Sequence, residues 1–318
     1  MAIKISVRPL AAVTTVVLVL CVFAYGATAQ VVSSGNAGTT SANFLKMGVG
    51  ARASALGGAF VAIADDATAG YWNPAGLPQI SHTELIFMHN DWYQDIKSNY
   101  LGAAFPVSNS FALGLGISYL DYGSFDGYDS DDRPTGEYSA NAFVLSTSGA
   151  YQLSRSLSIG VTGKIFSEKL EQSSATSYAV DFGALYRTAV VSMGLNLMNI
   201  GNGMKYETAE CPLPRRLVAG LAVRAYDGKL KLASDLEMLN DRGLSIHQGV
   251  EYCYERTVFL RTGYSHDFSN IVASGSSGMT MGIGVKHSIG AIDYSYWPDD
   301  RLGDIHKISF RLAFGGVE

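Results

Sequence analysis

Apolar side chains recur at every second position through most of the chain after Thr83. Between Phe111 and Tyr119, large apolar residues alternate with alanine, glycine and serine, and the same period is found from Ile308 to Phe314. A period of two is typical of strands with one apolar face. Because a soluble β-sandwich has the same alternation, no single strand decides the class. The pattern predicts fourteen strands, at 83–91, 98–106, 111–121, 138–151, 156–168, 176–187, 189–200, 214–226, 229–238, 244–254, 257–266, 278–288, 290–297 and 305–314.

The connections between these segments alternate in length. Tight turns are expected at 107–110, 153–155, 187–188, 227–228, 255–256 and 288–289, and longer loops at 122–137, 201–213, 237–243, 267–277 and 298–304. Outer-membrane barrels have an even number of strands, short turns on the periplasmic rim and long loops on the outer rim. In a soluble sandwich, nothing requires short connections at one end and long connections at the other.

Charged residues of the strands fall on the face opposite the large apolar side chains. Only 16% of residues are charged, and the chain is rich in glycine (35) and tyrosine (18), which suits a barrel with lipid outside and water inside. We therefore predict an all-β fold, a transmembrane antiparallel β-barrel of about fourteen strands over residues 81–318. The charges expected to face the lumen are Lys164, Asp181, Arg216, Arg224, Lys231, Asp235, Arg261, Lys286, Asp293 and Arg311.

Residues 1–29 have the three parts of a secretory signal peptide. Lys4 and Arg8 precede an apolar core from Leu10 to Tyr25, and a small-residue cleavage site, Ala27-Thr28-Ala29, follows. The alternative, a membrane-anchoring helix, is less favoured because the apolar run is short. A lipoprotein anchored at Cys21 is disfavoured because no small residue precedes it. Export to the bacterial outer membrane, with its lipid as a partner, is expected. Cleavage removes two cations and changes the net charge from −5 to −7, which argues against nucleic acid as a partner.

The mature chain keeps two cysteines, Cys211 and Cys253. The predicted strand order puts them near opposite rims of the barrel, too far apart for the geometry of a disulfide bond. We predict that both are unpaired.

Residues 30–80 differ from everything that follows. An extended lead-in over 30–42 precedes a segment at 43–79, rich in glycine and alanine, that can fit into a confined space. We expect this segment to be a small plug inside the barrel, containing short helices. One helical turn is expected at 51–56 and a second through Tyr71. The residues assigned to its motifs are Gly57 and Gly58 as a break, Asp65 and Asp66 as a helix cap, and Asn73, Pro74, Ala75 and Gly76 as a stop.

Catalytic and metal-binding patterns are weak in this sequence. The acidic run from Asp126 to Asp132 could hold calcium, but it lacks the spacing of an EF-hand loop, and a solvated acidic loop is favoured. The six histidines are scattered, with no HExxH motif. No phosphate-binding loop and no GxSxG elbow is present. We expect no cofactor, no metal and no enzymatic activity.

The plug residues resemble a known signature. The order Gly50-Ala51-Arg52-Ala53, then Leu56 to Ala62, Asp65-Asp66-Ala67 and Asn73-Pro74-Ala75-Gly76-Leu77 is similar to the N-terminus of the PorV/PorQ family, within the wider FadL-like group of outer-membrane proteins. The resemblance implies a fourteen-stranded barrel with an N-terminal plug. For FadL-type members it implies passage of hydrophobic small molecules through a break in the barrel wall. For PorV-type members it implies a shuttle or docking role in type IX secretion.

Two functions therefore stand as hypotheses. Docking of secretion-system proteins or exported substrates is expected first, because FadL-type transporters have larger outer loops; it needs an apolar outer surface, at 122–128 or 204–213. Transport of a hydrophobic small molecule is the alternative, and it needs an apolar pocket beside the plug and a lateral opening. The glycines that could kink a strand to make that opening, or simply make room for the plug, are Gly114, Gly116, Gly194 and Gly284. A purely structural barrel is a third option.

Overall fold

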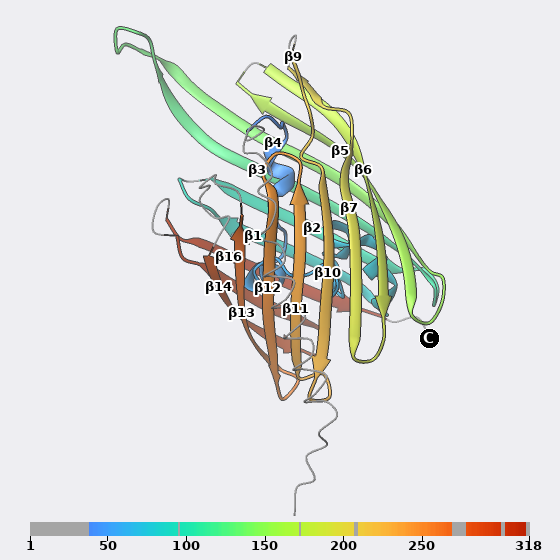
Figure 1. Cartoon of the computed structure of the whole chain (residues 1–318). Helices are drawn as coiled ribbons and strands as arrows, with labels where there is room; N and C mark the ends of the chain where they lie inside the picture. Colours follow the sequence, from blue (N-terminus) through green and yellow to red (C-terminus); the bar gives the residue numbers. More distant parts are fainter. Residues whose placement is uncertain are drawn as a thin grey trace, which may run out of the picture.

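The protein forms a closed antiparallel β-barrel of fourteen strands around a short N-terminal plug (Figure 1). The structure is a computed structural model that describes residues 38–94, 96–171, 173–206, 209–268, 278–299 and 303–315. The proposed signal peptide, residues 1–29, lies outside the described residues. The barrel strands are β1 (Thr83–Asp91), β2 (Lys97–Pro106), β3 (Phe111–Tyr128), β4 (Pro134–Gln152), β5 (Leu157–Leu170), β6 (Ser173–Arg187), β7 (Val191–Gly201), β10 (Arg216–Ala225), β11 (Leu230–Leu239), β12 (Gly243–Tyr254), β13 (Val258–Asp267), β14 (Gly278–His287), β15 (Gly290–Trp297) and β16 (Ile305–Phe314).

Each strand pairs with its neighbours along the chain, and β16 closes the barrel on β1. The closing ladder runs from the Thr83–Phe314 pair to the Asp91–His306 pair. Closure leaves no sheet edge within the wall, as a strand structure in lipid requires. The predicted fold class and strand order are confirmed.

Two predicted loops contain strands. Residues 122–137, expected as a loop, extend β3 and β4 into a long hairpin, with pairs such as Phe125–Tyr138. These residues are rich in Asp, Gly and Ser, which is typical of turns, and for this reason the sequence did not predict that they pair as strands. The predicted loop at 201–213 contains a separate hairpin of β8 (Met204–Tyr206) and β9 (Ala209–Cys211), so β7 pairs directly with β10.

The two faces of the wall differ as the alternation predicted. On β3, Leu113, Leu115 and Ile117 point outward and are 37–50% exposed, whereas Ala112 and Gly114 point inward. An outward belt of this kind is suited to lipid. The predicted lumen charges are buried or half-buried, except Lys286, which is exposed but lines a cavity at the short-turn rim together with Arg52 of the plug.

Four short helices form the plug: η3 (Asn43–Lys46), α2 (Ala51–Ala55), α3 (Ala69–Trp72) and η4 (Pro74–Gln79). Among the described residues, no helix combines the length and the apolarity needed to cross a bilayer. Helix α2 and its end at Gly57 and Gly58, which have positive φ angles of 67° and 87°, agree with the prediction.

The expected helix cap at Asp65 and Asp66 is wrong in detail. Helix α3 begins only at Ala69, after Thr68, and has no side-chain cap. The Asp66 carboxylate instead accepts hydrogen bonds from the Thr68 backbone N–H (3.0 Å) and hydroxyl (2.5 Å). The Asp65 carboxylate forms ion pairs with Arg52 and Lys231 instead of capping the helix. The acidic pair therefore orders the turn before the helix and does not cap it.

Cys211 and Cys253 are both free. Cys211 is in the β8–β9 hairpin on the long-loop rim, and Cys253 is at the end of β12, beside the short turn to β13. The prediction of two unpaired cysteines is confirmed.

Candidate functional site

The Asn73-Pro74-Ala75-Gly76 motif fastens the plug to the wall. Asn73 is fully buried, and its amide Nδ2 donates to the carbonyl oxygens of Val61 (3.0 Å) and Ala184 on β6 (3.1 Å). Its Oδ1 accepts from the Ala75 N–H (3.1 Å) at the start of η4. One side chain therefore joins two parts of the plug to a barrel strand, and the motif's position supports a structural role.

Replacing Asn73 with alanine is expected to lower the free energy of unfolding by about 2–3 kcal/mol. The change removes three hydrogen bonds and leaves two buried carbonyl oxygens without their partner. Urea unfolding in lipid vesicles measures the loss. Asn109→Ala, in an exposed turn, is the matched control. An equal effect of the two substitutions would contradict the assignment.

Inward-facing glycines of the strands form a collar around the plug. A Cβ atom added at Gly160 would lie 2.5 Å from the Pro74 carbonyl carbon, and one at Gly194 would lie 2.3 Å from the Val61 oxygen. Other members of this glycine collar are Gly183 against Asn73, Gly249 against Leu56, Gly263 against Gly57 and Gly282 against Ala55, whereas a Cβ at Gly220 would first meet the Asp235 carboxylate of the neighbouring strand, at 2.3 Å. At Gly160, Gly194, Gly249 and Gly263, backbone atoms of the plug therefore lie so close to the strand that they exclude any side chain there.

The four glycines considered for a lateral opening serve packing. A Cβ at Gly114 would meet Leu77 of the plug at 3.2 Å, and Gly194 belongs to the collar. Gly116 and Gly284 make room for side chains of neighbouring strands, Tyr100 and Arg261 among them. These contacts indicate that the four glycines make space for neighbouring atoms, and they do not indicate a kink in a strand.

A buried charge cluster joins the plug to the opposite wall. The Arg52 guanidinium contacts Asp65 (2.6 Å), Asp66 (3.1 Å) and both carboxylate oxygens of Glu251 on β12 (2.9 and 3.1 Å). Lys231 bridges Asp65 and Glu251, and Arg261 bridges Glu251 and Asp293, as shown by contacts of 2.7–3.2 Å. We call these residues and Arg311 the Arg52 cluster.

Asp65 of this cluster is held in its charged form. Burial by itself raises the pKa of Asp65, but the charges of Arg52 and Lys231 outweigh it and hold that pKa well below its usual range. Because the folded-state pKa is depressed, the stabilisation is present above the ordinary carboxyl pKa and is lost only as the pH falls through the folded value. The plug is therefore fastened throughout the neutral range.

Polar contacts also hold the start of the plug to the long-loop rim. Ser41 N–H donates to the Pro212 oxygen (2.9 Å), and the Thr40 hydroxyl donates to Asp241 (2.5 Å). Lys46 forms an ion pair with the same Asp241 carboxylate. Burial lowers the pKa of Lys46, and Asp241 offsets this only in part. Within the described residues, the plug thus begins at the long-loop rim and continues toward the short-turn rim.

An apolar wall lines the lumen beside the first segment of the plug, residues 43–49. It consists of Leu120, Ala142, Phe166, Ala175 and Ala179, on the inner faces of β3 to β6, all of them buried. Phe44 and Leu45 of the plug pack on this wall, with the Phe44 and Phe166 rings 6.0 Å apart and edge-on. Met204 of the β8–β9 hairpin and Leu213 complete the cluster at the long-loop rim.

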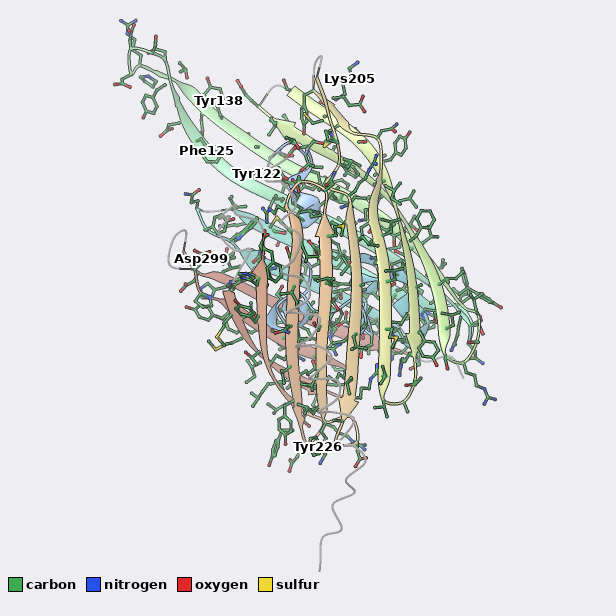
Figure 2. The ribbon with its side chains drawn as sticks, viewed as in Figure 1. Tyr122, Phe125, Tyr138, Lys205, Tyr226 and Asp299 are labelled. Carbon is green, nitrogen blue, oxygen red and sulfur yellow. The ribbon has the colours of Figure 1, made fainter. Side chains whose placement is uncertain are left out.

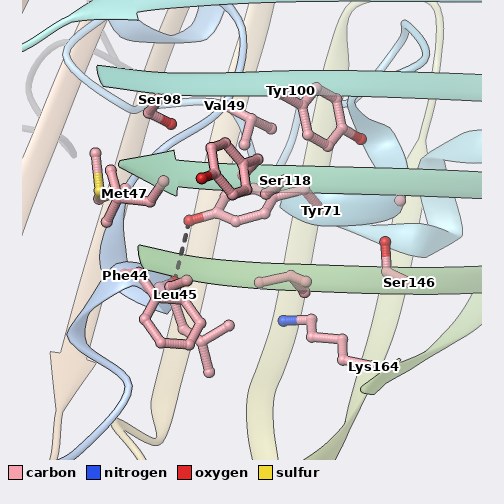
Figure 3. A pocket seen from close by; sticks show the side chains of 15 residues that line it. Phe44, Leu45, Met47, Val49, Tyr71, Ser98, Tyr100, Ser118, Ser146 and Lys164 are labelled. Carbon is pink, nitrogen blue, oxygen red and sulfur yellow. Dashed lines mark hydrogen bonds between the residues drawn. The ribbon is translucent and has the colours of Figure 1, made fainter. Parts of the chain in front are cut away.

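A cavity of about 30 Å³ remains between the first segment and strands β2 to β5 (Figure 3). Leu45, Met47 and Val49 line it from the plug side, and Tyr100, Leu120 and Val144 line it from the barrel side. Across the lumen, the plug is bordered by a second cavity of about 140 Å³, whose lining includes the charged residues Arg216 and Glu237 as well as His247. The plug thus lies between two cavities, and charged side chains are more numerous in the second.

The described part of the wall has no gap beside the apolar region. The β6–β7 ladder is irregular near Asp181, between the pairs Val180–Ile200 and Phe182–Leu197. The Asp181 carboxylate fills this position by accepting from the Asn199 N–H (2.8 Å) and pairing with Lys164 (2.6 Å). The bulge is therefore closed by a buried ion pair.

Metal-ligand groups are not gathered anywhere in the described residues. In the acidic loop, the Asp129 carboxylate accepts from the backbone N–H groups of Asp131 and Arg133, both at 2.9 Å. That is the arrangement of a turn stabilised by its own side chain.

Comparisons with known proteins add a family and a fold. The family model of the Uncharacterised protein family (UPF0164) matches residues 21–225. Among solved structures, the CymD monoaromatic hydrocarbon channel is similar with a TM-score of 0.64 and 15% identity, over 84% of this chain and 98% of that one. The toluene transporter TodX of Pseudomonas putida has a TM-score of 0.62 and 15% identity, over 84% of this chain and 97% of its own.

The toluene transporter TbuX of Ralstonia pickettii is similar to the same degree, with a TM-score of 0.61 and 14% identity, over 84% of this chain and 99% of that one. At such identities the likeness is one of fold. A search of curated proteins found no match. The family match spans more than half of the 318 residues, and the chain therefore belongs to the Uncharacterised protein family UPF0164.

Proposed function

We propose that the protein is an outer-membrane channel for hydrophobic small molecules. The observation that carries this proposal is the apolar wall inside the lumen, which the chain's own Phe44 and Leu45 cover. A barrel lumen that is filled only with water does not require a buried apolar cluster of this kind. Sequence reasoning ranked docking first and transport second; the apolar wall and the fold likeness to hydrocarbon channels favour the reverse order.

In this proposal, the first segment of the plug occupies the ligand's position on the apolar wall when no ligand is bound. Burying a phenylalanine or leucine side chain stabilises by about 1.5–3 kcal/mol, so a hydrophobic molecule of similar size can replace one of these side chains at little net cost. The ligand then lies between the first segment and the apolar wall, while the glycine collar below keeps water and polar solutes out. Residues 1–29 serve as the signal peptide, 30–80 as lead-in and plug, and 81–318 as the barrel. No catalytic step is required.

Ala142→Trp is expected to reduce uptake of a hydrophobic aromatic compound about tenfold, which corresponds to about 1.4 kcal/mol in binding free energy. Ala142 is buried in the apolar wall, and an indole ring there takes the space that a ligand would use. The measurement is uptake of radiolabelled p-xylene by cells with the protein in their outer membrane. Thr147→Trp on the same strand faces outward and is the control for insertion. Equal uptake by the two variants, both folded, would contradict the proposal.

The proposed membrane orientation can be tested with the native cysteines. A membrane-impermeant maleimide added to intact cells is expected to label Cys211, on the long-loop rim, and not Cys253, on the short-turn rim. Disruption of the outer membrane should allow labelling of Cys253 as well. Cys211→Ser and Cys253→Ser variants identify the labelled site. Labelling of Cys253 before Cys211 would show that the barrel has the opposite orientation in the membrane.

Docking of secretion partners or exported proteins is retained as the second candidate because of one observation. The β3–β4 hairpin, which carries Phe125, projects from the long-loop rim (Figure 2). Phe125 and Tyr128 on this hairpin are 53% and 60% exposed. In the other surface considered, 204–213, Met204 and Leu213 are buried in the cluster with Phe44 and Leu45, so these two side chains are not presented to a partner. Mass spectrometry of the protein purified from its own outer membrane tests the docking function. Stoichiometric exported proteins that are lost with a Phe125→Ser/Tyr128→Ser variant would favour docking.

A further inference from the structure

The cavity beside the apolar wall is too small for a ligand while the first segment is in place. A volume of about 30 Å³ holds about two water molecules. A ring-sized ligand must therefore displace the first segment and contact the barrel side chains directly. These barrel side chains decide which chemistry the site accepts, and the following inference rests on the proposed function.

The cavity offers no charge to a ligand. Lys164 is the one ionisable cation among its lining residues, and its ammonium is already paired with Asp181 (2.6 Å) and donates to Asn199 Oδ1 (3.0 Å). Both Lys164 and Asp181 are buried, at 6% and 0% exposure. A carboxylate entering here would have to be desolvated without an available partner, which is strongly unfavourable. The site therefore disfavours anionic ligands.

The Tyr100 hydroxyl in the lining has no hydrogen-bond partner among the described residues. Tyr100 on β2 is only 4% exposed and borders the cavity, yet its hydroxyl makes no hydrogen bond to any residue that the structure describes. A buried tyrosine hydroxyl usually has a partner. By contrast, the Tyr71 hydroxyl in the same cavity donates to the Leu45 oxygen (3.3 Å), as Figure 3 shows.

The wall is shaped to hold the Tyr100 ring in this position. A Cβ at Gly102 would lie 2.7 Å from the ring, and one at Gly116 would lie 3.1 Å from its hydroxyl oxygen. Two glycines on adjacent strands therefore make room for one aromatic side chain. Ser118, next along the inner face of β3, also lines the cavity and has no side-chain hydrogen bond within the described chain.

We propose that the ligand is a neutral hydrophobic molecule with one hydrogen-bonding group, such as a phenol or an alcohol, and that the Tyr100 hydroxyl binds that group. The apolar wall takes the hydrocarbon part. The paired Lys164 and Asp181 exclude charged analogues. Tyr100 is thus a specificity-determining residue for the channel.

The test compares three probes of one shape: p-xylene, p-cresol and p-toluate. Near pH 7 the phenol is neutral and the carboxylate is charged. Dissociation constants are measured by equilibrium dialysis against the full barrel in lipid nanodiscs, with empty nanodiscs as the blank for partitioning. Tyr100→Phe removes only the hydroxyl, and it is expected to weaken p-cresol binding about fivefold, the effect of one hydrogen bond. Binding of p-xylene should stay unchanged, and p-toluate should bind neither protein.

Tyr186→Phe, which removes a hydroxyl from the outward face of β6, is the matched control and should change neither constant. If Tyr100→Phe binds p-cresol as the wild type does, or if p-toluate binds as tightly as p-cresol, the inference fails while p-xylene binding still supports a hydrophobic channel. If neither p-xylene nor p-cresol binds above the blank, the proposed function fails together with it.

Discussion

Replacing Gly160 with valine is expected to prevent the plug from seating in the barrel and to lower the free energy of unfolding by about 3 kcal/mol, at the upper end of the usual cost of overpacking. A Cβ at this position would lie 2.5 Å from the Pro74 carbonyl carbon and 2.6 Å from the Ala75 N. Both are backbone atoms, so no side-chain rotation relieves the clash. The Asn73 motif must move off β5, which also breaks its hydrogen bonds to Val61 and Ala184.

Gly163 on the same strand supplies the control. It faces outward, and an added Cβ would meet no atom within 4 Å. Valine at Gly163 also favours strand structure, so this variant should be as stable as the wild type. Urea unfolding in lipid vesicles gives the stability, and ion conductance across a planar bilayer reports the plug. A Gly160→Val barrel as stable and as tightly closed as Gly163→Val would show that the collar does not position the plug.

The strands could be predicted from the sequence because most inner positions are small or polar and most outer positions are large and apolar. This contrast fails at the long-loop rim. Residues 122–137 pair as a hairpin beyond the membrane belt, where nothing enforces an apolar face, and their Asp and Gly residues resemble a loop. The β8–β9 hairpin was missed for the same reason and because its strands are short.

The site was predictable only in part. The plug motif was recognised, but its partners are distant in the chain: Asn73 binds Ala184, and Arg52 binds Glu251. Local patterns carry no information on such pairs. One signal did exist, since Arg52 is the only charged residue between Lys46 and Asp65, and a lone charge in a buried segment needs a partner.

A second signal lay in exceptions to the strand pattern. Leu120 and Phe166 are large apolar residues at inward positions of β3 and β5, where the other inward residues are small or polar. Taken together, they mark the apolar wall on which the proposed function depends.

Arg52→Met is expected to have the larger effect on the closed state of the barrel. It removes the central cation of the Arg52 cluster and leaves Asp65, Asp66 and Glu251 with fewer cations than they need. Removing one partner of a buried ion pair costs about 3–5 kcal/mol, because the remaining charges are desolvated without compensation. Repulsion then acts between plug and wall, since two of these acids are on the plug and the third is on β12.

The plug is therefore expected to loosen in Arg52→Met before the barrel unfolds. Ion conductance across a planar bilayer should rise, and urea should release the plug at lower concentration than in the wild type. Arg155→Met, at an exposed arginine in the β4–β5 turn, removes the same charge without these contacts and should leave both measurements unchanged. Arg52→Lys separates charge from geometry, because a lysine ammonium cannot bridge three carboxylates as the planar guanidinium does. It should give an intermediate conductance. If Arg52→Met conducts no more than Arg155→Met, the cluster does not fasten the plug, and the collar alone must keep the barrel closed.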